Sequence, residues 1–90
     1  MVIVDSHCHV SPSWYEPVES LLFQMDRHSV GHAVLIQIQG KFDNSYQFDC
    51  LRRCPGRFAP VVFVDAARPD AVEALARLAE EGASGVRLMP

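Results

Sequence analysis

Features that would assign a function class at once are scarce in this sequence of 90 residues. Eight lysines and arginines stand against eleven aspartates and glutamates, for a net charge of −3, and they form no basic run or basic helix face. A phosphate backbone requires a positive surface, so we expect no nucleic-acid partner. No apolar run approaches the ~20 residues that span a bilayer, and no positive segment precedes Asp5. We therefore expect neither a membrane span nor a signal peptide, and a cytoplasmic protein.

Cysteine is also sparse. The three thiols, Cys8, Cys50 and Cys54, are odd in number, and the spacing of Cys50 and Cys54 suits adjacent turns of a helix better than a zinc knuckle. We expect all three to be reduced and to act as small hydrophobic side chains. Linkers and low-complexity segments are absent, and the length limits the chain to a single domain, residues 1–90.

What is present is an alternation of short β-branched runs with longer amphipathic segments. Four strands are expected, which begin near Val2, Ala33, Val61 and Gly85. The runs are continuously apolar rather than alternating, a pattern typical of parallel strands. Their starts recur at roughly 25 to 30 residues, the length of one strand–helix repeat.

Helix signals lie between these runs. The first expected helix follows Glu16-Pro17 and has a regular apolar stripe, with Gly31 at its end; the stripe comprises Val18, Leu21, Leu22 and Met25. A short second helix is expected over residues 45–53. The third opens at Pro69 and ends at Gly82, with an apolar stripe of Val72, Leu75, Ala76 and Ala79.

The resulting order is βαβαβαβ, an α/β fold. An open doubly wound sheet and the first half of a (β/α)8 TIM barrel share this local pattern, so periodicity alone does not separate them. In the barrel the parallel strands would lie in the order 1-2-3-4. A barrel typically has ~250 residues, so the chain would then be a partial barrel domain, a fragment of a longer one.

The strongest motif is Asp5-Ser6-His7-Cys8-His9 at the end of the first strand. Because side chains alternate along a strand, we expect Asp5, His7 and His9 on one face and Cys8 on the other, toward a helix. Two imidazoles at this spacing can chelate one divalent ion, most simply Zn²⁺, with Asp5 in a supporting role. Histidines that are merely satisfied at a surface edge are the alternative, which two histidines and an aspartate on one strand make less favourable.

This metal site would be incomplete, since catalytic zinc usually has three protein ligands and a water. The other histidines, His28 and His32, fall near a helix end and at the start of a strand, away from the rim. We therefore assign both to structural roles.

The stretch Val4 to Val10 resembles the opening of the amidohydrolase-related family of metal-dependent hydrolases, with lactonase-like members the most similar. Further stretches look like corresponding parts of those proteins: residues 14–17, 43–46, 55–58 and 85–88. The resemblance implies a distorted TIM barrel, His7 and His9 as metal ligands, and hydrolysis of an ester, lactone or amide of a small organic acid. By the same resemblance, the remaining ligands and the general base fall beyond Pro90.

Several alternatives remain open at this point. A related metal-dependent decarboxylase would open in the same way. TatD-type deoxyribonucleases and histidinol-phosphatase-type phosphoesterases also begin similarly, but their later motifs are missing here. A non-catalytic truncated fragment belongs to a different class.

Substrate contacts are predicted for the loops that follow the strands. The candidates are Trp14, Tyr15, Asn44 and Tyr46 at the rim, together with Arg87 on the fourth strand, whose guanidinium suits a carboxylate. Each has a structural alternative, such as packing on the first helix or pairing with a neighbouring acid. Asp65, after the third strand, is a weaker candidate that would equally cap a helix.

The first and fourth strands of a half-barrel are both edges. Two copies could pair these edges about a two-fold axis and so form a homo-oligomer. Marginal stability or aggregation of the chain alone is the competing expectation.

Overall fold

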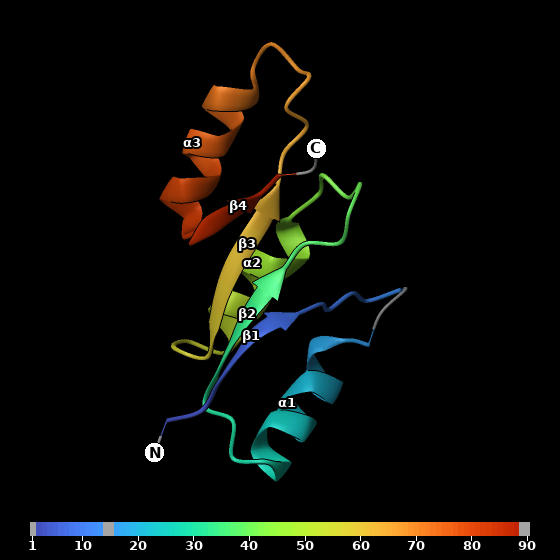
Figure 1. The fold of residues 1–90 in the computed structure, drawn as a ribbon, viewed down its shortest axis with the longest axis vertical. Helices are drawn as coiled ribbons and strands as arrows, with labels where there is room; N and C mark the ends of the chain where they lie inside the picture. The colour runs from blue at the N-terminus through green and yellow to red at the C-terminus, as the bar shows by residue number, and fades with distance from the viewer. Residues whose placement is uncertain (1, 14–15, 89–90) are drawn as a thin grey trace.

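The computed structural model describes residues 2–13 and 16–88, which form one parallel sheet with three helices. The elements follow the order β1 (Val4–Cys8), α1 (Val18–Arg27), β2 (His32–Ile36), α2 (Ser45–Arg53), β3 (Phe58–Phe63), α3 (Ala71–Glu81) and β4 (Gly85–Arg87). The strands lie in the order β1-β2-β3-β4, and every neighbouring pair is parallel. The expected βαβαβαβ fold with sequential strand order is confirmed (Figure 1).

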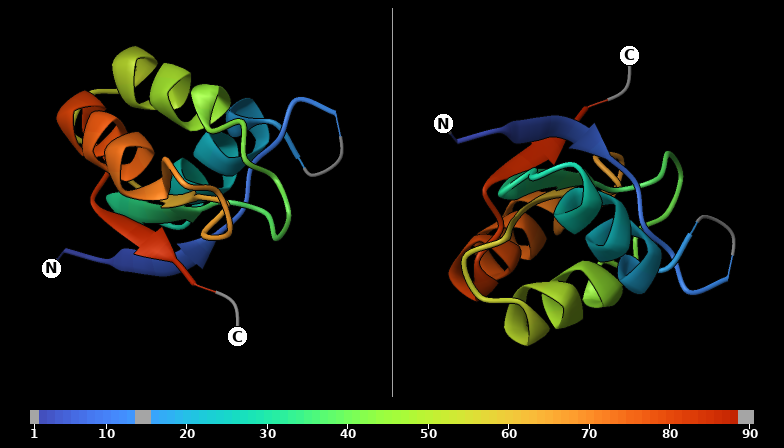
Figure 2. Two further views of the ribbon diagram at one scale, coloured as in Figure 1. Left: turned by 90° about the horizontal axis from the view of Figure 1, so that it is seen from above. Right: turned by 90° about the horizontal axis from the view of Figure 1, so that it is seen from below.

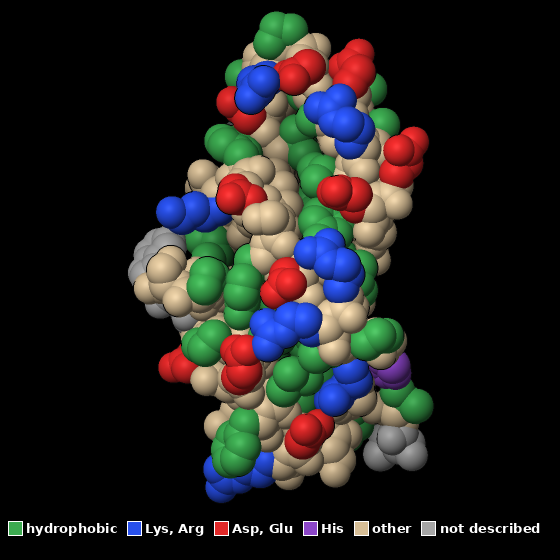
Figure 3. All heavy atoms as spheres, turned by 180° about the vertical axis from the view of Figure 1, so that it is seen from behind, with side chains coloured by type: hydrophobic (Ala, Val, Ile, Leu, Met, Phe, Trp, Pro, Cys, Tyr) green, Lys and Arg blue, Asp and Glu red, His purple; other side chains and the backbone are tan. Residues whose placement is uncertain are grey.

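All three helices lie on the same side of the sheet (Figure 2). A doubly wound sheet would carry helices on both faces, so this arrangement is that of a half-barrel. In both views β1 and β4 lie farther from the helices than β2 and β3 do, so the uncovered face is concave. The helix face has acidic and basic side chains around apolar furrows (Figure 3). None of the helices in the described part of the chain is long and apolar enough to cross a bilayer.

The core lies between the sheet and the helices. Val18 and Met25 of α1 pack against Ala33 and Leu35 of β2, with Cys50 of α2 in the same cluster, all almost inaccessible to solvent. Burial of one such aliphatic side chain contributes about 1.5–3 kcal/mol. Val34 and Ile36, which alternate with the buried pair along β2, are only half-buried on the concave face. The continuous apolar run of this strand thus has one covered face and one open face.

The first helix ends differently from the expectation. Gly31 was expected to end α1, but the left-handed residue after this helix is Ser29, with φ of 59°. The Val30 N–H then bonds to the Met25 carbonyl at 2.8 Å, and the Gly31 N–H is used for the Ile3 carbonyl at 2.9 Å. Arg57, the residue before β3, holds this turn by donating to the carbonyls of Gly31 and Val30. The long-range contacts therefore decide which residue adopts the left-handed conformation.

The third strand begins at Phe58, three residues before the β-branched run on which it was expected. Pro60 lies inside it, although proline is rarely found in a central strand. The Ser84 N–H bonds to the Pro60 carbonyl and the ladder to β4 starts at Val61, so the missing N–H of Pro60 falls just before that ladder begins. The position tolerates proline for this reason.

The end of the third helix is as expected, because Gly82 has φ of 117° and its N–H bonds to the Ala79 carbonyl. Its buried face is different. Val72 is 78% exposed, and Ala76 and Ala79 are exposed as well, whereas Leu75 and Leu78 are half-buried. The expected stripe through Val72 was therefore wrong by about one position, because apolar residues surround much of this alanine-rich helix and its packing on β3 and β4 selects the face.

Truncation of the two faces of α3 separates these interpretations. We expect Leu78→Ala to lower the free energy of unfolding by about 1–2 kcal/mol and Val72→Ala to change it by less than about 0.5 kcal/mol. Urea titration followed by circular dichroism measures both. A larger loss for Val72→Ala would show that the originally expected face is the buried one.

Candidate metal centre

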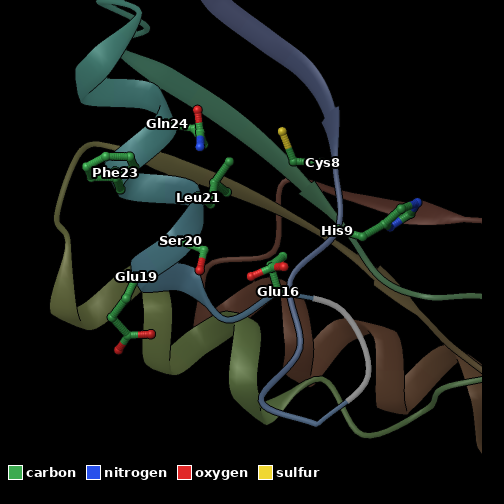
Figure 4. Close-up of a pocket in the computed structure, with 8 residues that line it drawn as sticks. All are labelled: Cys8, His9, Glu16, Glu19, Ser20, Leu21, Phe23 and Gln24. Atoms are coloured by element: carbon green, nitrogen blue, oxygen red, sulfur yellow. The ribbon is translucent and has the colours of Figure 1, made fainter.

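The histidine pair lies at the carboxyl end of β1, on the concave face of the sheet. The Nε2 atoms of His7 and His9 are 3.2 Å apart, and their rings meet edge to face with planes at 87°. Figure 4 shows His9 leaving β1 on the side away from α1, whereas Cys8 points toward that helix. The expected convergence of the two imidazoles and the opposite direction of Cys8 are both found.

The orientation of His9 is set by a neighbouring strand. Its Nδ1 lies 2.6 Å from the carbonyl oxygen of Ile36 at the end of β2. A carbonyl can only accept, so Nδ1 carries the proton and Nε2 presents its lone pair toward His7. A backbone carbonyl on the second ring nitrogen is the usual arrangement behind a metal-binding imidazole.

Asp5 takes a different position from the one that strict alternation predicts. The register between β1 and β2 shifts between Asp5 and Cys8, which pair with Ala33 and Leu35 respectively. Both β2 partners face the helices, so the extra residue in β1 returns Asp5 to the side of Cys8. The expectation that Asp5 shares the face of the histidines is therefore wrong.

The Asp5 carboxylate is held by two donors. The His7 N–H donates to Oδ1 at 3.1 Å, and this bond, followed by that from the Cys8 thiol, lowers the pKa of the carboxyl from its usual value. Burial of the Cys8 thiol is the main reason that its pKa is raised to about 12. The Asp5 carboxylate raises this pKa further, because it accepts a hydrogen bond from the thiol and carries a negative charge. Asp5 thus fixes the backbone at His7 through its bond from the His7 N–H.

A second polar cluster joins the carboxyl ends of the other strands. The buried Asn44 side chain bonds to both the N–H and the carbonyl of Phe63 at 3.1 Å, and it also accepts from the Gln37 amide at 3.2 Å. Arg87 donates from Nη1 to the Gln37 carbonyl at 2.9 Å. These contacts tie the ends of β2, β3 and β4 together.

The substrate candidates are dispersed in this structure. Trp14 and Tyr15 lie outside the described residues. Asn44 serves the strand ends, and the Tyr46 hydroxyl accepts from the Val18 N–H at 2.9 Å, at the start of α1 on the helix side. Arg87 pairs in register with Phe63 and is half-buried, and its contact is a backbone carbonyl rather than an acid. Substrate contact by any of these residues remains a prediction.

The residues that were assigned structural roles make contacts with the backbone. His32 Nδ1 lies 2.8 Å from the Gly56 carbonyl, at the amino end of the sheet. The Cys54 N–H bonds to the Cys50 carbonyl at 3.0 Å, on adjacent turns as expected, and none of the three cysteines forms a disulfide. Asp65 accepts from the Ala67 N–H in the turn before α3. Sequence reasoning missed Gln37, whose buried amide has no motif to mark it.

A groove of about 670 Å³ lies between β1 and α1, beside the site. It is lined by Cys8, His9, Glu16, Glu19, Ser20, Leu21, Phe23 and Gln24 (Figure 4). The groove is on the helix side of the free edge of β1, whereas the imidazoles point to the concave face. We therefore assign the candidate centre to the histidine pair and not to this groove.

The fold and the site together define the first half of a parallel (β/α)8 barrel with two imidazoles at its carboxyl-end rim. The same fold occurs in a solved structure, a probable 2-pyrone-4,6-dicarboxylic acid hydrolase from Acinetobacter baumannii with citric acid bound. The TM-score is 0.79 at 24% sequence identity, over 98% of this chain and 38% of that one. The chain thus spans well under half the length of that protein. No family model and no curated protein matches the sequence.

The placement of Asp5 can be tested through the thiol beside it. We expect Asp5→Asn to accelerate alkylation of Cys8 by iodoacetamide several-fold under native conditions, because the carboxylate that disfavours the thiolate is lost. Mass spectrometry of the labelled peptide gives the rate. Asp43→Asn is the matched control, since Asp43 accepts from Ser45 at the surface. Equal rates in the wild type and Asp5→Asn would contradict the contact with Cys8.

Proposed function

We propose that this chain supplies part of the active site of a metal-dependent hydrolase that acts on an ester, lactone or amide of a small organic acid. The observation that carries the proposal is the imidazole pair at 3.2 Å, with His9 oriented by the Ile36 carbonyl. The likeness of fold to a protein described as a hydrolase of a pyrone dicarboxylic acid supports the same reaction class. We propose further that the chain is one part of a barrel domain whose other strands complete the site.

The donor set fits a zinc-type ion. Tetrahedral coordination at ~2.0–2.1 Å places two nitrogens about 3.3 Å apart, close to the separation of the two Nε2 atoms. The His9 tautomer already directs an unprotonated nitrogen to the shared point. When bound, such an ion supplies Lewis acidity toward a carbonyl oxygen and lowers the pKa of water. His7 and His9 would hold the ion. The Ile36 carbonyl orients the ring of His9, and Asp5 fixes the backbone of His7.

Arg87 is the proposed anchor for a substrate carboxylate. The register places Ile36, Val61 and Gly85 on one face, and Phe63 and Arg87 follow two residues later on that same face. His9, which follows Cys8 opposite Leu35, also belongs to it. Arg87 and the imidazoles therefore face the same concavity from β4 and β1, about 14 Å apart along the sheet at ~4.8 Å per strand.

The guanidinium of Arg87 is available for this role. It has five N–H donors, and the Gln37 carbonyl uses one nitrogen while fixing the plane of the group. No ion pair of Arg87 occurs among the residues that the structure describes. A small organic acid would thus reach from the carboxylate anchor to the reacting carbonyl near the imidazoles. The citric acid and the dicarboxylic substrate named for the A. baumannii protein support an acidic ligand.

A metal-binding role without turnover is the second candidate. Within residues 2–13 and 16–88 no third histidine, cysteine or acid joins the pair to form a metal cluster. Two imidazoles bind an ion but do not provide a general base. Turnover therefore requires groups from further strands, whereas binding of the ion does not.

Zinc titration tests the metal centre. We expect wild-type protein to bind Zn²⁺ and His7→Ala or His9→Ala to lose at least tenfold in affinity, because each removes one of two ligands. Isothermal titration calorimetry measures the dissociation constants. His28→Ala is the matched control, since His28 is exposed at the end of α1, away from the pair. Unchanged affinity in both variants of the pair would overturn the assignment.

The carboxylate anchor has a separate test. Citrate should perturb the amide resonances at the ends of β2 and β4, and Arg87→Met should weaken its binding about tenfold through loss of a charge-assisted hydrogen bond. NMR titration gives the dissociation constant. Arg77→Met, at an exposed position on α3, is expected to bind citrate as the wild type does. Equal weakening by both variants would indicate a non-specific effect of charge.

A further inference from the structure

The concave face and the edges beside it form one continuous uncovered surface. At the β1 side, Val2 is 72% exposed, Ile3 41% and Val4 53%, and beyond β4 Leu88 is 75% exposed. Apolar surface of this kind contributes about 25 cal/mol per Å² when it is removed from water. The groove beside α1 extends this surface past the edge of β1 on the helix side. The surface therefore favours a partner that covers the face and both edges together.

Backbone groups on the two edges are directed outward. The Val61 carbonyl accepts from the Gln37 N–H on the β2 side, so the backbone groups of Val62 face β4. The register of Val62 with Val86 then directs the Arg87 N–H toward β3 and leaves the N–H and carbonyl of Val86 directed away from it. On the other edge the His32 N–H contacts the Ile3 carbonyl, which leaves the N–H and carbonyl of Val4 directed away from β2. Unpaired groups like these at a sheet edge act as templates for another strand.

We propose that this surface binds a second copy of the chain, with β4 of each copy parallel to β1 of the other. Four parallel strands with all helices on one side are half of the eight that close a barrel. One two-fold axis along the barrel axis pairs both edges of both copies and buries both concave faces. A single added strand would leave one edge and most of the concave face uncovered.

The dimer also changes the metal centre, and this consequence rests on the proposed function. A rotation about the barrel axis keeps the carboxyl ends of all eight strands at one rim. β1 and its copy then lie on opposite sides of the barrel, and both histidine pairs face the enclosed interior. The second copy thus contributes His7 and His9 to a site that has two imidazoles in one copy.

A substitution on the edge of β4 tests the pairing. Val86→Pro removes an N–H that β3 does not use, whereas Val86→Ala keeps that N–H and shortens the same half-buried side chain. In sedimentation equilibrium with a chelator present, we expect wild type and Val86→Ala to form dimers. Val86→Pro should raise the dimer dissociation constant at least tenfold while retaining the wild-type circular dichroism spectrum.

Hydrogen exchange provides a measurement on the unmodified protein. The amides of Val4 and Val86 should become protected as the concentration rises through the dissociation constant. A folded monomer at high concentration, open-ended aggregates, or a dimer whose edge amides exchange freely would each overturn the proposal. The chelator separates this result from the proposed function, because loss of zinc binding leaves the edge pairing measurable.

Zinc then tests the shared site. Zinc should tighten the wild-type dimer at least tenfold, and His9→Ala should abolish that effect without dissolving the metal-free dimer. A metal-free dimer that zinc does not tighten would overturn the shared site and leave the edge pairing supported.

Discussion

The parallel register between β1 and β2 is the constraint on which the candidate site depends. This register carries the Ile36 carbonyl to 2.6 Å from His9 Nδ1, and so determines both the ring orientation and the nitrogen that bears the proton. The bulge between Asp5 and Cys8 acts in the same place, since it separates Asp5 from the histidines and places it against Cys8. A short motif on one strand thus acquires its chemistry from the strand beside it.

The carboxyl ends of β2, β3 and β4 likewise depend on hydrogen bonds between the strands. Asn44 occupies a position between β2 and β3, and its amide satisfies both polar groups of the Phe63 backbone. Gln37 continues this network to Arg87, which it fixes through its own carbonyl. Unpaired buried amides would cost about 1–3 kcal/mol each, so the network stabilises the rim while it orients a cationic side chain. The same hydrogen bonds therefore position the Arg87 side chain and stabilise this edge of the sheet.

Local patterns accounted for most of the elements. Ser45 to Arg53 forms the helix expected there, Gly82 ends α3, and the strand order follows from consecutive βαβ units. The exceptions have tertiary causes. Arg57 and Ile3 hold the turn that makes Ser29 rather than Gly31 left-handed, and Pro60 joins β3 because the ladder to β4 begins one residue later. The face of α3 was ambiguous because many of its residues are small and apolar.

The sequence by itself indicated which side chains can do chemistry here: the spacing of His7 and His9 at a strand end predicts a close pair of imidazoles, because alternate positions share a face where no bulge intervenes. It could not determine how Asp5, Asn44 and Tyr46 are used, since each has polar atoms that suit either a ligand or the backbone. The tertiary structure decided this by placing Asp5 beside Cys8, Asn44 on Phe63 and Tyr46 on α1. The physical reason is that a buried backbone group requires a hydrogen-bond partner, and which polar side chain provides it depends on register and packing that no local pattern encodes.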